Sequence, residues 1–145
     1  VVWAYDKSEK SIDVAKLNAK LNRLDVSFFV ADMNKELISK QTTFDVIVSN
    51  PPYVLQSEQT LMQSNVLDYE PHTALFVSDE NPLHFYRAIL NQSINMLSVG
   101  GRIYFEINER MGNEMVELLI ESGFVDILLK NHLNSKPRFV TGIKG

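Results

Sequence analysis

Short apolar segments alternate with helical patterns along the chain, and this alternation limits the fold more than any other feature. The predicted strands up to the middle of the chain are 1–5, 26–30 and 44–49. After the first of them, Ser8 is a predicted helix N-cap. Apolar residues then follow at helical spacing: Val14, Leu17, Leu21 and Leu24. Because parallel strands need a crossover connection, this order predicts an α/β fold with a mostly parallel sheet.

The second half of the chain continues the pattern. Asn81 and Pro82 are the predicted N-cap and first residue of a helix that Gly100 and Gly101 should stop. Its expected apolar face is Leu83, Tyr86, Ile89, Leu90, Ile94 and Leu97. A strand over 102–108 and a helix over 112–122, ended by Gly123, should come next. The last two strands, 125–129 and 139–143, have no helix between them and should pair antiparallel.

Composition excludes several classes of protein. The 145 residues are enough for one domain with a core, and cysteine is absent, which excludes disulfides and cysteine-bound zinc. The three histidines are too scattered to suggest a metal site, and no apolar run approaches the roughly 20 residues of a membrane span. The net charge of −4 argues against a large nucleic-acid interface. We therefore expect a cytoplasmic domain without a metal.

Polar residues close three successive predicted strands: Asp6, Asp32 and Asn50. In open α/β sheets ligands bind outside the carboxyl ends of the strands. A carboxylate there can accept from both hydroxyls of a ribose, and a second one from an exocyclic amine. Asp6 and Asp32 could instead begin ordinary loops, as aspartate often does. Their matching positions beside Asn50 favour a ligand site.

The segment Asn50-Pro51-Pro52-Tyr53 opens a stretch, 51–80, that has little periodicity, and a loop of this length usually has a function. Neither proline has an N–H, so the segment offers carbonyl oxygens without competing donors. The Asn50 side chain adds another acceptor, and Tyr53 can stack on a flat group. Such a site suits a planar NH2, whose two hydrogens it can hold while the nitrogen attacks. A simple Pro-Pro turn is the alternative.

These residues resemble a known family. Asn50-Pro51-Pro52-Tyr53 is similar to the motif of S-adenosylmethionine-dependent methyltransferases that modify amide or exocyclic nitrogens. The whole chain resembles the HemK-type protein-(glutamine-N5) methyltransferases of peptide-chain release factors. The similar stretches are VWAYDKSEKSIDVAKLNA, YEPHTALF, GGRIYFEIN and SKPRFVTG. The resemblance implies a Rossmann-like class I methyltransferase fold with a C-terminal antiparallel hairpin. Where the family usually has glycine after Glu-Ile, this chain has Asn108.

The resemblance also implies roles for the site residues. Asp6 would bind the ribose of S-adenosylmethionine, and Asp32 and Met33 would lie at its adenine. Asn50 would contact both the methyl donor and the substrate amide. With Pro51, Pro52 and Tyr53 it would form the catalytic motif. The partner implied is a release factor, which would be methylated on a glutamine side chain.

Compared with the family, the chain begins at the second strand, so the first strand and its glycine-rich loop are missing. We therefore expect residues 1–145 to be a catalytic domain truncated at its N-terminus and inactive alone. The first strand would lie between 1–5 and 44–49, which would be left with unpaired backbone groups. Three remedies are predicted: direct pairing of these strands, self-association of the chain, or further residues that fill the gap.

Two other functions fit the same residues. An adenine-N6 methyltransferase of DNA or RNA uses the same Asn-Pro-Pro-aromatic logic, because the adenine amine is also planar. The negative charge and the similarity of Tyr69-Glu70-Pro71 to the release-factor branch favour the protein substrate. A non-catalytic α/β binding module is the third hypothesis, since half of the donor pocket would be missing.

Overall fold

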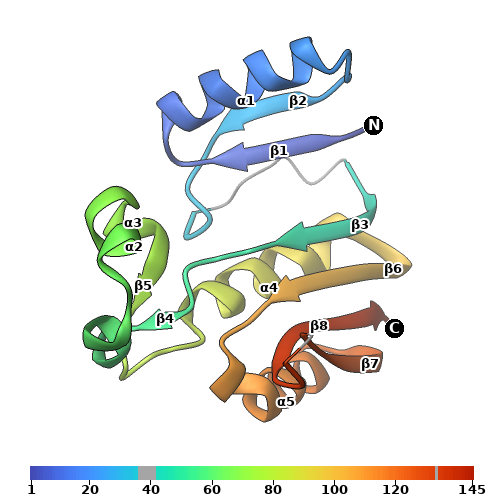
Figure 1. Cartoon of the computed structure of the whole chain (residues 1–145). Helices are drawn as coiled ribbons and strands as arrows, with labels where there is room; N and C mark the ends of the chain where they lie inside the picture. Colours follow the sequence, from blue (N-terminus) through green and yellow to red (C-terminus); the bar gives the residue numbers. More distant parts are fainter. Residues whose placement is uncertain (36–41, 133) are drawn as a thin grey trace. The chain divides into compact units, whose positions relative to one another are not determined.

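The computed structural model describes residues 1–35, 42–132 and 134–145. The chain divides into two compact units, Val1–Ser39 and Lys40–Gly145 (Figure 1). Both units combine strands with helices, and the parallel strand pairs and the C-terminal antiparallel strands confirm the predicted α/β class. No helix in the described part of the chain is long and apolar enough to cross a bilayer.

The first unit is a strand–helix–strand motif. It consists of β1 (Trp3–Asp6), α1 (Glu9–Leu21) and β2 (Ser27–Val30). The strands are parallel, with Trp3 opposite Ser27 and Asp6 opposite Val30. Ser8 is the N-cap, as predicted: its side chain accepts the N–H of Ser11 at 3.2 Å. A capping oxygen satisfies one of the free N–H groups of the first turn, which fixes where the helix starts.

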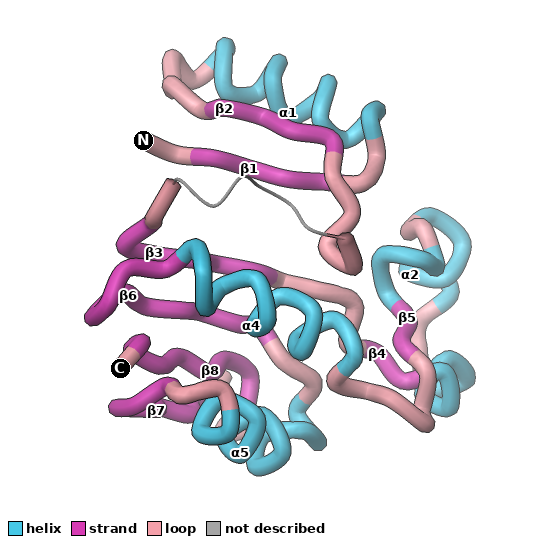
Figure 2. The backbone as a smooth tube through the Cα atoms, turned by 180° about the vertical axis from the view of Figure 1, so that it is seen from behind, coloured by secondary structure: helices cyan, strands magenta, loops and turns pink. Residues whose placement is uncertain are grey.

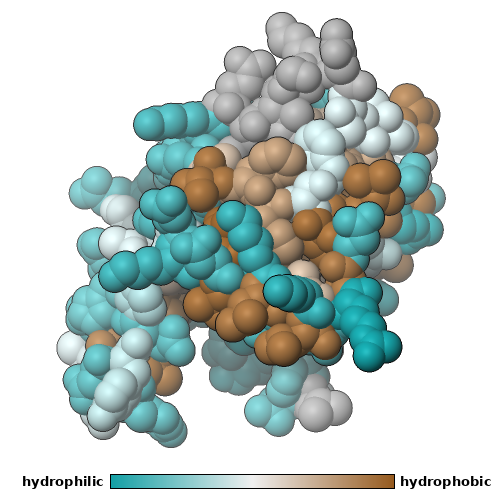
Figure 3. All heavy atoms as spheres, turned by 90° about the horizontal axis from the view of Figure 1, so that it is seen from above, coloured by the Kyte–Doolittle hydropathy of each residue, from teal (hydrophilic) through white to brown (hydrophobic). Residues whose placement is uncertain are grey.

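The apolar residues that predicted α1 in the sequence are not the ones that the helix buries. Ile12 and Ala19 are its buried residues. The residues that define the helical spacing in the sequence are all more than half exposed: Val14, Leu17, Leu21 and Leu24. Figure 3 shows apolar side chains at the surface among polar ones. A two-stranded sheet is narrow, so within this unit it covers only one side of the helix.

The second unit is built on a four-stranded sheet with the order β3-β6-β8-β7. The pair β3–β6 is parallel, and β8 is antiparallel to both β6 and β7, as expected for a closing hairpin. The strands are β3 (Phe44–Ser49), β6 (Leu97–Glu106), β7 (Phe124–Asn131) and β8 (Pro137–Lys144).

Two helices, α4 (His84–Met96) and α5 (Gly112–Glu121), lie on the same face of this sheet (Figure 2). Their buried side chains and those of the sheet form one core: Leu83, Tyr86, Leu90, Leu97, Ile103, Phe105, Ile107, Met115, Leu118, Leu119, Phe124 and Val140. Between β6 and α5 the chain makes a short 3-10 helix, η2 (Glu109–Met111), and Gly123 follows α5 with a φ of 82°. The predicted end of α5 is therefore confirmed.

The predicted bounds of α4 are wrong at both ends. Its N-cap is Leu83, and Asn81 instead accepts the N–H of His84 at 3.2 Å in a turn before the helix. The helix ends at Met96, so Gly100 and Gly101 lie within β6 and do not stop it. Leu97 is opposite Phe44 in the sheet, and this long-range pairing draws Leu97 into the strand before the glycines are reached.

Residues 51–80, in which the sequence shows little periodicity, form several short helices and strands. These are β4 (Val54–Leu55), η1 (Gln56–Leu61), α2 (Ser64–Tyr69), α3 (His72–Leu75) and β5 (Phe76–Val77). The strands β4 and β5 pair parallel, and Asp79 accepts hydrogen bonds from the backbone N–H, at 3.1 Å, and the hydroxyl of Ser57. Elements of two to six residues are too short to give a period in the sequence.

The strands β1 and β3 belong to separate sheets. In the described residues β1 is paired with β2, and β3 with β6. Because β1 and β3 lie in different units, all three remedies, direct pairing, self-association and filling of the gap by further residues, stay predictions.

Candidate active site

The carboxyl edge of the first unit holds two aspartates. Asp6 is the last residue of β1 and lies opposite Val30, and Asp32 follows β2 after one intervening residue. In each, Oδ1 accepts a backbone N–H from two residues further on: Ser8 for Asp6 at 2.7 Å, and Asn34 for Asp32 at 3.0 Å. These local bonds fix the direction of both carboxylates at the edge where open α/β sheets bind ligands.

Within residues 1–35, the other carboxylate oxygen, Oδ2, accepts no hydrogen bond in either residue. The backbone N–H of Asn34 is the main cause that holds the pKa of Asp32 below its usual range, so this carboxylate stays ionised at neutral pH. Two open acceptors at neighbouring strand ends fit a ribose diol and an exocyclic amine. Met33, the third predicted donor-binding residue, is half-buried beside Asp32.

In the second unit, Asn50-Pro51-Pro52-Tyr53 follows the carboxyl end of β3. Asn50 is exposed, and its side chain makes no hydrogen bond within residues 42–132 and 134–145. Pro51 and Pro52 are both buried. The prolines thus anchor the segment in the protein while Asn50 presents a free amide to solvent.

Tyr53 is held by two charged residues. Its hydroxyl donates a hydrogen bond to Oε1 of Glu106 at 2.8 Å, and the guanidinium carbon of Arg138 lies 5.3 Å from the ring centre. Arg138 also pairs with the same Glu106 oxygen at 2.6 Å. Burial, followed by the bond to Glu106, raises the pKa of Tyr53 to about 12. The phenol therefore stays protonated and acts as a donor, and one face of its ring is taken by Arg138.

A buried asparagine holds the backbone of the same segment. Asn108 is only 6% exposed, and its Nδ2 donates to the carbonyl of Tyr53 at 3.1 Å and to Oε2 of Glu58 at 2.7 Å. Its Oδ1 accepts the N–H of Arg110 at 2.9 Å. This is the position at which the sequence departs from the glycine usual in the family it resembles.

The predicted site residues are divided between the two units. Of the predicted donor-binding residues, Asp6, Asp32 and Met33 lie in the first unit, whereas Asn50 lies in the second. The four residues Asn50, Pro51, Pro52 and Tyr53 lie together in the second.

Sequence reasoning missed the residues that support Tyr53. Glu106 ends β6, so the rule that selected Asp6 and Asn50, a polar residue closing an apolar strand, could also have found it. No local sequence pattern distinguishes Arg138 or Glu58. Their importance lies in long-range contacts, of Arg138 with Tyr53 and of Glu58 with Asn108.

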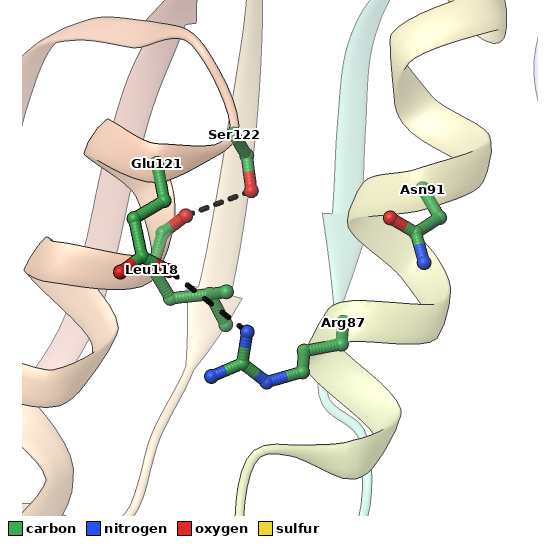
Figure 4. A pocket seen from close by; sticks show the side chains of 5 residues that line it. All are labelled: Arg87, Asn91, Leu118, Glu121 and Ser122. Carbon is green, nitrogen blue, oxygen red and sulfur yellow. Dashed lines mark hydrogen bonds and ion pairs between the residues drawn. The ribbon is translucent and has the colours of Figure 1, made fainter.

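A separate shallow cavity of about 230 Å³ opens between α4 and α5, lined by Arg87, Asn91, Leu118, Glu121 and Ser122 (Figure 4). The exposed pair Arg87–Glu121, 3.9 Å apart, lies across it. It contains none of the predicted site residues. Residues 1–35, 42–132 and 134–145 contain no cluster of three side chains suited to a metal ion.

Comparison with known proteins gives consistent results. Residues 1–70 match the model of the family "Methyltransferase small domain". The chain is 42% identical to the release factor glutamine methyltransferase of Flavobacterium psychrophilum, over 96% of this chain and 48% of that protein. It is 39% identical to the enzyme of the same name from Bacteroides thetaiotaomicron, over 97% of this chain and 50% of that protein. The chain thus spans about half the length of the curated relatives it matches.

The fold is also found in solved structures. A methyltransferase from Pyrococcus furiosus superposes with a TM-score of 0.69 at 19% identity, covering 99% of this chain and 62% of that one. At this identity the likeness shows the fold, which is the Rossmann-like class I methyltransferase fold. Over 96–97% of its length the chain is thus similar to release factor glutamine methyltransferases, and it has the methyltransferase fold.

Proposed function

We propose that this protein transfers a methyl group from S-adenosylmethionine to the side-chain amide nitrogen of a glutamine in a peptide-chain release factor. The observation that supports this most directly is Asn50-Pro51-Pro52-Tyr53 at the carboxyl end of β3, with Asn50 exposed and both prolines buried. The names of the relatives, which are about 40% identical, support the substrate. We further propose that residues 1–145 act as one catalytic part of a cytoplasmic enzyme.

In this proposal the first unit binds the methyl donor. The Asp6 carboxylate accepts the two ribose hydroxyls, and the Asp32 carboxylate accepts the adenine amine, with Met33 beside the base. When bound, S-adenosylmethionine supplies an electrophilic methyl group on a sulfonium. The fit rests on the two Oδ2 atoms, which are free of hydrogen bonds within residues 1–35.

The second unit holds the substrate amide. A neutral amide nitrogen is a poor nucleophile because its lone pair is delocalised into the carbonyl. The Asn50 side-chain oxygen and a neighbouring proline carbonyl accept its two hydrogens, which orients the nitrogen and stabilises the positive charge that develops during attack. The nitrogen–carbon bond would form as the sulfur–carbon bond of the donor breaks, with the electron pair of that bond staying on the sulfur, and one proton would pass from the nitrogen to water. Tyr53 remains a neutral donor to Glu106 and is not the base.

The test is methylation by the full-length protein. It is incubated with S-adenosylmethionine and either a release factor or duplex DNA, and the products are analysed by mass spectrometry. One added methyl on a glutamine of the release factor is expected, and none when Asn50 is replaced by alanine. Methylated adenine would establish the second candidate function instead. Binding of S-adenosylhomocysteine without any transfer would identify a non-catalytic module.

A further inference from the structure

We propose that Glu106 and Asn108, at the end of β6, are positioning residues that fix the Asn50–Tyr53 segment for methyl transfer. This inference rests on the proposed function. Neither residue belongs to the Asn-Pro-Pro-Tyr motif, and both act through Tyr53.

The two residues hold Tyr53 at opposite ends. The Glu106 carboxylate accepts the phenol hydroxyl at 2.8 Å, and the Asn108 amide donates to the backbone carbonyl at 3.1 Å. A bond at the tip of the ring alone would leave the backbone free to shift, and a bond at the carbonyl alone would leave the ring free to rotate. Together they fix the plane of the ring and the path of the chain that follows Asn50.

These two hydrogen bonds to Tyr53, together called the grip, are themselves anchored in the core of the second unit. The backbone carbonyl of Glu106 accepts the hydroxyl of Tyr86 at 2.8 Å, and Tyr86, 1% exposed, packs edge-on against Phe105 with ring centres 5.2 Å apart. Arg138 of β8 pairs with the Glu106 carboxylate at 2.6 Å. Contacts from α4 and β8 therefore converge on one residue at the end of β6, which makes it a rigid support.

Asn108 extends the support to the segment after Tyr53. Its second amide hydrogen goes to Oε2 of Glu58 at 2.7 Å, and the same oxygen accepts the N–H of Leu55 at 3.1 Å. Arg110 approaches the other Glu58 oxygen at 3.4 Å. Both hydrogens and the oxygen of the Asn108 amide are thus used within the protein, and the side chain is buried. Asn108 has no group left for a substrate, so its role is to position other residues.

The chemistry explains why such support matters. Acceptors accelerate amide methylation only if they hold the nitrogen in line with the methyl group, and a misplacement of about 1 Å can cost roughly 10²-fold in rate. In the proposal Asp6, Asp32 and Met33 supply most of the contacts with the methyl donor, so its binding should depend little on Tyr53. Loss of the grip should therefore lower kcat and leave donor affinity unchanged.

The test uses the full-length protein with Asn108→Ala, Glu106→Ala and Glu106→Gln. The controls are Asn91→Ala, an exposed asparagine of α4, and Glu109→Gln, whose ion pair with Lys136 at 2.6 Å involves neither Tyr53 nor Glu58. Three quantities are measured: kcat on the release factor, affinity for S-adenosylhomocysteine, and hydrogen exchange of the amides in residues 53–58.

Asn108→Ala and Glu106→Ala should each lower kcat by about 10- to 100-fold, with donor affinity within about twofold of the parent. Glu106→Gln keeps an acceptor for the phenol and should retain part of the lost kcat. Exchange of the amides in residues 53–58 should accelerate by about tenfold in the alanine variants only, and the two controls should resemble the parent.

Parent-like kcat and exchange in both alanine variants would overturn the proposal. A uniform loss of kcat, donor affinity and global stability would do so too, since it would show a merely structural role. If Asn108→Ala does not fold, Glu106→Gln and Tyr53→Phe decide the matter by the same measurements. If the parent methylates nothing, the proposed function fails, and the exchange of residues 53–58 alone decides whether the grip exists.

Discussion

The hydroxyl of Tyr53 and the carboxylate of Glu106 form a hydrogen bond of 2.8 Å between residues that lie 53 positions apart in the chain. The bond joins the end of the Asn-Pro-Pro-Tyr segment to the end of β6, and Arg138 of β8 completes it by pairing with the same carboxylate oxygen. Three elements of the second unit therefore meet at one aromatic side chain.

The burial of Tyr53, together with its bond to Glu106, predicts a dependence of stability on pH. The pKa of Tyr53 is raised from 10.0 to about 12, so the folded state holds the phenol proton more tightly than the unfolded state does. The contribution is complete below pH 10 and is lost as the pH rises from about 10 to about 12. The difference in free energy of unfolding between the parent and Tyr53→Phe should accordingly shrink over that window, as denaturant titrations at several pH values will show. A constant difference would mean that neither burial nor Glu106 holds the phenol proton in the folded protein.

Asn50→Ala should lower turnover by about 10²-fold or more, the scale observed when one polar group directed at a transition state is removed. Because Asn50 is exposed and makes no hydrogen bond within the described part of its unit, the free energy of unfolding should stay within about 0.5 kcal/mol of the parent. Steady-state kinetics and thermal unfolding on the same preparation separate the two effects. Turnover near that of the parent would exclude the proposed role.

Asp6→Asn is expected to weaken binding of the methyl donor more than it slows chemistry. Contacts with a ribose hold ground state and transition state alike, so their loss appears in affinity. Asparagine keeps an oxygen for the N–H of Ser8, which protects the start of α1, but it replaces the outer acceptor by a donor. Calorimetric titration with S-adenosylhomocysteine measures the change, and Asp13→Asn on the exposed side of α1 is the matched control. Equal affinities in the two variants would assign Asp6 to the loop alone.

Lys144→Met should destabilise the fold by about 1 to 2 kcal/mol. The ammonium group donates to the carbonyls of Ile94 at 2.6 Å and Leu97 at 2.7 Å, where the last carbonyls of α4 have no partner in the helix. Methionine keeps the aliphatic stem and removes only the charge and the donors. Denaturant unfolding compared with Lys130→Met, a change at an exposed lysine of β7, isolates this capping effect. Identical midpoints would show that water replaces the ammonium without loss.

Local sequence patterns determined the elements whose causes lie within a few residues. The cap at Ser8, the parallel strands that flank α1, the end of α5 before Gly123 and the closing pair β7–β8 all follow from spacing and turn chemistry. The same holds for Asp6, Asp32 and Asn50 as polar strand ends, because a strand and the residue after it are adjacent in the chain.

Only the tertiary structure decided which distant residues these helices and strands contact. The sequence could not place Leu97 in β6, since its pairing with Phe44 depends on the register of a strand 53 positions away. It did not show that Val14 and Leu17 lie exposed on α1, because helical spacing identifies a face without identifying its neighbour. The support of Tyr53 by Glu106, Asn108 and Arg138 needs the order β3-β6-β8, which brings the ends of three strands together. Periodicity reports contacts two to four residues apart, whereas sheet order and register set the distant contacts that hold a site in place.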